Sequence, residues 1–123
     1  MLLFIGKTMG MVFYINESEA WDTSKAFFAV MADAMTEQIN TRDLFEQKLS
    51  KMLEEASEFL VLKDLTVEEF NHFCRIYKKA KDKYPDSKNG IHVKKNGHFP
   101  ELWGAWEALP KRLKLDPRYR DSL

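Results

Sequence analysis

Two histidines, His92 and His98, lie in a lysine-rich stretch together with Lys88, Lys94 and Lys95. One imidazole can take a proton from an attacking hydroxyl, a second can protonate the leaving group, and a lysine can stabilise the charge of a phosphorane. These are the groups that a metal-independent ribonuclease needs. Nothing in the spacing shows the two rings converging, so a solvated basic loop is the favoured interpretation and the ribonuclease an alternative.

Cys74 and His72 are the other pair of groups able to do nucleophilic chemistry. They are two residues apart on an expected helix and therefore point in different directions, so Cys74 is predicted to be a buried thiol and His72 a solvated side chain. The four side chains His72, Cys74, His92 and His98 show none of the usual spacings of zinc ligands. We expect no metal site and no cofactor.

The tripeptide Gly6-Lys7-Thr8 matches only the end of a phosphate-binding loop, because the first glycine of that motif is missing. A turn is the better interpretation. The sequence therefore gives no catalytic residue, and it predicts a protein that is not an enzyme.

The charges of the chain are unevenly distributed, although they sum to zero. Residues 1–74 hold 13 acidic and 6 basic side chains, whereas residues 75–123 hold 6 acidic and 13 basic ones. Such a field acts on partners rather than on the fold. The basic half predicts, as an alternative, a surface for nucleic acid. Its candidate residues are Lys94, Lys95, Lys111 and Arg112.

The acidic half predicts a surface for a protein partner. Its outward-facing carboxylates complement a basic protein, and complementary charge raises the encounter rate and the selectivity. The candidate residues are Asp22, Asp33, Asp43, Glu54 and Glu58.

Hydrophobic periodicity predicts helices over about 23–40, from Thr41 to about Leu60, and from Thr66 to Pro85. The last of these starts with a capping box, in which Thr66 and Glu69 each satisfy one backbone amide of the first turn. The shared apolar faces predict a core that includes Phe27, Met31, Phe45, Leu49, Met52, Phe70, Phe73 and Tyr77.

The remaining segments are shorter. The apolar runs 2–5 and 11–15 predict a small hairpin, and a short strand over 91–93 is expected between the turn dipeptides Asn89-Gly90 and Asn96-Gly97. A last helix is expected from Pro100 to Pro110.

Together these elements predict a mainly α fold of three to four packed helices with a small N-terminal β-hairpin, and an α+β fold as the alternative. At 123 residues we expect a single domain, 1–123. One cysteine, no signal peptide and no apolar run of about 20 residues favour a cytoplasmic protein without a membrane segment.

A small helical protein with an acidic face and no catalytic motif is similar in general character to the immunity proteins of contact-dependent growth inhibition. This resemblance implies a non-enzymatic protein that binds a basic, nuclease-type toxin domain and blocks its active or substrate-binding site. The alternatives are a nucleic-acid-binding accessory protein and a ribonuclease built on His92 and His98.

Overall fold

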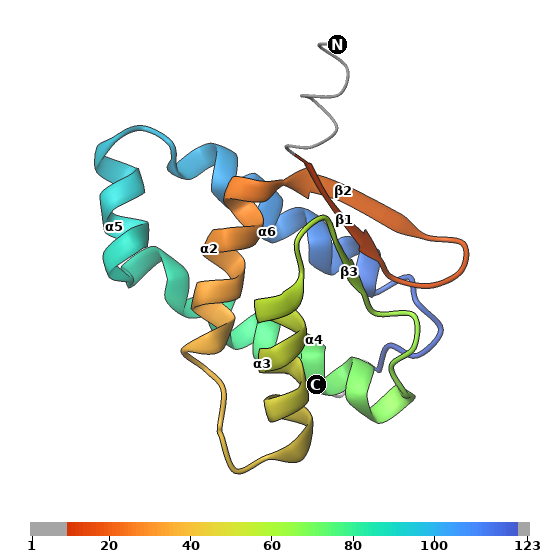
Figure 1. The fold of residues 1–123 in the computed structure, drawn as a ribbon. Coiled ribbons are helices and arrows are strands. Elements are labelled where there is room, and N and C mark those ends of the chain that lie inside the picture. The colour runs from red at the N-terminus through yellow and green to blue at the C-terminus, as the bar shows by residue number, and fades with distance from the viewer. Residues whose placement is uncertain (1–9, 121–123) are drawn as a thin grey trace.

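The computed structural model describes residues 10–120, in which a small sheet packs against helices that gather on one side of it (Figure 1). The strands are β1 (Gly10–Tyr14), β2 (Ala20–Ser24) and β3 (Phe59–Val61). The helices are α2 (Lys25–Thr36), α3 (Leu44–Glu55), α4 (Val67–Lys83), the short 3₁₀ helix η1 (Tyr84–Asp86), α5 (Lys88–Lys95) and α6 (Phe99–Leu113).

The sheet makes the fold α+β, which fits better than the mainly helical prediction. Its order is β2-β1-β3, with β2 antiparallel and β3 parallel to the central strand β1. Met11 and Phe13 alternate with Val12 and Tyr14, so one face of β1 is buried against the helices. Residues 2–5 lie outside the described residues, and the described hairpin partner of β1 is β2, a mostly polar strand in which only Trp21 is buried.

The three long helices predicted from periodicity are confirmed, with adjusted ends. Each begins with a side chain that accepts a backbone hydrogen bond: Ser24 for α2, Asp43 for α3 and Thr66 for α4. Asp43, rather than Thr41, therefore caps the second helix. The capping box of Thr66 and Glu69 is present as predicted. Because the Thr66 backbone amide donates to Glu69, the pKa of that carboxyl lies below its usual value.

The second helix also ends earlier than its apolar stripe. The stripe predicts helix to about Leu60, but α3 ends at Glu55 and Leu60 lies in β3. Pairing with the apolar central strand determines the structure of this segment more than its helical periodicity does, because Leu60 is buried in the sheet beside Phe13.

The segment after α4 differs most from expectation. Residues 91–93 lie in α5 rather than in a strand, since the Ser87 hydroxyl accepts from the amide of Gly90 and starts a helix. Close packing, rather than a special backbone conformation, requires glycine at position 90. A Cβ at this position would stand 2.1 Å from the carbonyl oxygen of Tyr84.

The last helix contains Pro110 instead of ending there. Proline has no N–H to donate to the carbonyl four residues earlier, which belongs to Trp106. That carbonyl accepts the buried hydroxyl of Tyr77 at 2.8 Å instead. The hydrogen bond joins α4 to α6 and satisfies the carbonyl that the proline leaves without a helical donor.

The core lies between the sheet and the helices, and six of the eight residues predicted for it are buried there. Trp106 is completely buried and its ring contacts those of Phe27, Tyr77 and Tyr84. Of the predicted core, Phe45 and Met52 are only partly buried. The predicted members that are buried are Phe27, Met31, Leu49, Phe70, Phe73 and Tyr77.

Arg118, in the segment after α6, connects this segment to the ends of the strands. Its guanidinium donates to the carbonyls of Ile15, Leu62 and Leu65 at 2.7–2.9 Å and to both carboxylate oxygens of Asp116. Asn16 donates to the same carboxylate. Burial acts to raise the pKa of Asp116, but the hydrogen bonds from Arg118 and Asn16 outweigh it and hold the pKa at about 2.

The first prediction concerns Gly90. Gly90→Ala should destabilise the fold by about 1–3 kcal/mol, because backbone atoms must move to admit the new Cβ. Gly104→Ala is the matched control: it also lies in a helix, but nothing stands within 4 Å of an added Cβ. It should stabilise by about 0.5–1 kcal/mol, since alanine is the better helix former. Urea denaturation of both variants is the measurement, and equal effects would contradict the close approach.

The second prediction concerns acid stability. The pKa of Asp116 is lower in the folded chain than its ordinary value of 3.8, so its contribution is complete above about pH 4 and is lost as the pH falls toward 2. The contribution is about 2 kcal/mol. Urea denaturation at several pH values should show a shallower loss between pH 4 and pH 2 in Asp116→Asn than in the wild type. Identical slopes would contradict the assignment.

A candidate site on helix α4

Helix α4 carries two neighbouring pockets, and Arg75 lines both of them. The α4–α6 pocket has a volume of about 600 Å³ and the His72 pocket about 420 Å³. The α4–α6 pocket is lined by Cys74, Arg75, Tyr77, Lys78, Lys79, Lys81, Asp82, Pro110, Leu113, Lys114 and Tyr119. The His72 pocket is lined by Phe45, Val67, Glu68, Glu69, Asn71, His72, Arg75 and Arg120.

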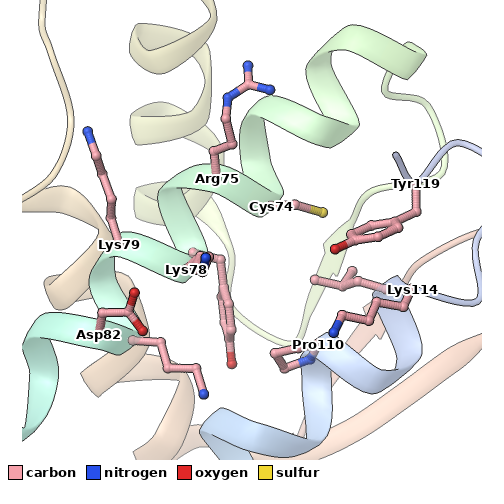
Figure 2. A pocket seen from close by; sticks show the side chains of 11 residues that line it. Cys74, Arg75, Lys78, Lys79, Asp82, Pro110, Lys114 and Tyr119 are labelled. Atoms are coloured by element: carbon pink, nitrogen blue, oxygen red, sulfur yellow. The ribbon is translucent and has the colours of Figure 1, made fainter. Parts of the chain in front are cut away.

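The α4–α6 pocket is strongly cationic. Figure 2 shows Lys78, Lys79 and Asp82 along α4, with Pro110 and Lys114 on the opposite wall and Tyr119 at one end. Five of its lining residues carry a positive charge, and Asp82 is the one acid among them. A hollow with charge of one sign concentrates the field and attracts anions such as phosphate groups.

Cys74 and Tyr77, two possible nucleophiles among the lining residues, both have raised pKa values. Burial, above all, raises the pKa of the Cys74 thiol to about 12, as expected for the buried cysteine predicted from the sequence. Burial also raises the pKa of Tyr77, whose hydroxyl is already engaged with the Trp106 carbonyl. The pocket is therefore suited to binding rather than to covalent chemistry.

His72, which lines the smaller pocket, forms an imidazole–carboxylate pair with Glu46, which is not one of the lining residues. His72 Nε2 lies 2.8 Å from Glu46 Oε2, and the ring of Phe45 is 4.9 Å from the imidazole. The other oxygen of Glu46 accepts the backbone N–H of Asn40 at 2.7 Å, which fixes the carboxylate. His72 is thus not the freely solvated side chain expected from the sequence, since its side chain is 21% exposed and paired.

Asp43 completes a small group of metal-ligating side chains. One ligand atom each from Asp43, Glu46 and His72 lie within 4.8 Å of one another. Sequence spacing could not reveal this group, because 26 residues separate Glu46 from His72 and two helices bring them together.

The predicted ribonuclease pair is not assembled. His92 Nε2 lies 3.0 Å from the side-chain nitrogen of Asn96 on the exposed side of α5. His98 is the exposed residue before α6 and makes no side-chain cap. Across residues 10–120, no hydrogen bond connects the two rings. Gly6-Lys7-Thr8 lies outside the described residues.

The alternative basic candidates are exposed but lie outside the α4–α6 pocket. Lys94 donates to the Pro85 carbonyl at 2.9 Å and Arg112 pairs with Glu19 at 2.6 Å, so both are engaged within the chain. Lys95 on α5 and Lys111 on α6 are exposed.

The acidic candidates are spread over several elements rather than over two helices. Asp22 lies on β2, Asp33 on α2, Glu54 on α3, and Glu58 just before β3. Asp43 caps α3 by accepting the Glu46 amide at 2.9 Å. Their role in partner binding stays a prediction.

No family model matches the chain, and no curated protein matches it. Its structure is similar to a solved "CdiA-CT toxin from Burkholderia pseudomallei E479 in complex with cognate CdiI immunity protein", with a TM-score of 0.66 and 17% identity. The similarity covers 87% of this chain and 96% of that chain. At this identity the likeness establishes a shared fold. In residues 10–120, no helix is sufficiently long and apolar to span a membrane.

This similarity corrects two predictions. The sequence predicts an immunity protein, but the fold is shared with a toxin, so that prediction is wrong. The prediction that the chain is not an enzyme rested on the absence of a visible catalytic set, and it is contradicted by the same similarity to a toxin. The general character of the sequence does not identify the fold, because acidic residues, small size and missing motifs describe a surface.

The third prediction concerns Cys74. With a pKa of about 12, almost none of the thiol is ionised at pH 8, whereas a free cysteine has a pKa of about 8.5. A disulfide reagent at pH 8 should therefore react at least ~100-fold more slowly with the folded chain than with the urea-unfolded chain. Similar rates in both states would show that Cys74 is accessible and ionisable.

Proposed function

We propose that this chain is a toxin-type domain that binds and cleaves nucleic acid, and that a cognate protein partner controls it. The observation that carries the proposal is the α4–α6 pocket, with Arg75, Lys78, Lys79, Lys81 and Lys114 facing a single acid. Cationic hollows of this kind bind phosphates because each contact releases condensed counterions. The toxin-like fold supports a destructive activity rather than a protective one.

The neighbouring His72 pocket supports the enzymatic part of the proposal. Arg75 connects the two pockets, so a phosphodiester chain held in the cationic pocket runs close to the His72–Glu46 pair. An imidazole held by a carboxylate is a common general acid or base. Arg75 and Arg120 are placed to stabilise charge on a phosphate.

The proposed partner follows from the same charges. The toxin of similar fold was solved in complex with a cognate immunity protein. A protein that covers the α4–α6 pocket must present carboxylates to its lysines, because unpaired cations buried in an interface are costly. We therefore propose an acidic partner, in contrast to the basic one that the sequence predicts.

The fourth prediction tests binding. The triple variant Lys78→Gln, Lys79→Gln, Lys114→Gln should bind a labelled 12-nucleotide RNA or DNA at least ~10-fold more weakly than the wild type. The salt dependence should also become weaker: the slope of log binding constant against log salt concentration should be less negative by about 2, because roughly 0.7 counterions are released per phosphate of a single strand. Fluorescence anisotropy at several salt concentrations measures both effects.

A matched control separates the pocket from total charge. The triple Lys25→Gln, Lys51→Gln, Lys63→Gln removes three exposed lysines elsewhere and should keep nearly wild-type affinity. If both triple variants lost affinity equally, the effect would be due to net charge and not to the α4–α6 pocket. Cleavage of the same labelled strands tests the catalytic part of the proposal. It would be contradicted if the wild-type protein left the strands uncut, or if the His72→Gln variant cut them as fast as the wild type.

A further inference from the structure

We propose that Asp43, Glu46 and His72 form a binding site for one divalent transition-metal ion of the zinc type. The three ligand atoms, one nitrogen and two carboxylate oxygens, lie within 4.8 Å of one another. The proposal rests on the ligand geometry and not on the function proposed above. An ion bound here would occupy His72 Nε2, so in the metal-bound chain this atom would not act as the general acid or base.

A single ion would require only small shifts of the ligand atoms. Ligand atoms that each lie about 2.1 Å from zinc are about 3.4 Å apart in a tetrahedral site. His72 Nε2 and Glu46 Oε2 are 2.8 Å apart, so a small rotation of either side chain makes room for the ion between them. Three protein ligands leave a fourth position for water or a substrate oxygen, as in catalytic zinc sites.

The carboxylates are oriented for this role by contacts behind them. Glu46 Oε1 accepts the Asn40 amide while its Oε2 lies against His72 Nε2, and Asp43 Oδ1 accepts the Glu46 amide. Such backing hydrogen bonds orient metal ligands and tune their affinity. The Phe45 ring restricts the imidazole from another side, at 4.9 Å.

The charge of the group also favours a cation. Two carboxylates face one imidazole, and the side chains of Glu46 and His72 are only 13% and 21% exposed. One nitrogen and two oxygens suit Zn²⁺ or Mn²⁺, whereas Mg²⁺ prefers oxygen ligands alone.

Isothermal titration calorimetry of the full chain after dialysis against EDTA provides the test, with ZnCl₂, MnCl₂ and MgCl₂ as titrants. We expect one Zn²⁺ per chain with a Kd of ~10 µM or tighter, weaker Mn²⁺ binding in the Irving–Williams order, and still weaker Mg²⁺ binding. His72→Ala and Asp43→Asn should each weaken Zn²⁺ binding at least ~10-fold.

Two controls keep the outcome decisive. Asparagine caps helices as well as aspartate, so Asp43→Asn removes ligand charge while keeping the start of α3 folded. His98→Ala removes an exposed histidine elsewhere and should bind Zn²⁺ like the wild type. Absence of stoichiometric Zn²⁺ binding, or wild-type affinity in a folded Asp43→Asn variant, would overturn the proposal. No nucleic acid enters the experiment, so its failure leaves the binding triples of the previous section unaffected.

Discussion

The Arg118 guanidinium fixes the arrangement on which both pockets depend. Its five N–H groups donate to three backbone carbonyls, at the ends of β1 and β3 and before α4, and to Asp116. The guanidinium also lies over the ring of Phe70 in the first turn of α4, at 4.2 Å. Since α4 carries both pockets, the segment after α6 orients the site. Buried charge is tolerated here because every donor has an acceptor.

Local rules predicted those parts of the fold whose causes are local. The capping box at Thr66 and the apolar face of α4 need only neighbouring residues, and both were found. Of the two Asn-Gly dipeptides, Asn96-Gly97 forms a turn as predicted, with Gly97 at a φ of 76°. Asn89-Gly90 instead lies in α5, where Gly90 is retained for its close contact with the Tyr84 carbonyl. β2 was missed because its pairing with β1, not its composition, makes it a strand.

The candidate site was largely invisible to sequence reasoning for the same reason. His72 meets Glu46 across 26 residues, and Arg118 meets Ile15 across 103 residues. No spacing rule covers such separations. The lysines of α4 were visible as a basic run, but only packing against Pro110 and Lys114 turns that run into a pocket.

The charge division of the sequence acquires a different meaning in the structure. The boundary after Cys74 falls inside α4, so it does not lie between two elements of the fold. Glu68 and Glu69 stand in the first turn of this helix and Lys81 and Lys83 in the last, which is the order that the helix dipole favours. Arg75 lies at the boundary between the carboxylates near His72 and the cationic pocket. The proposed metal-ligating group and the cationic pocket thus adjoin along one helix, with Arg75 between them.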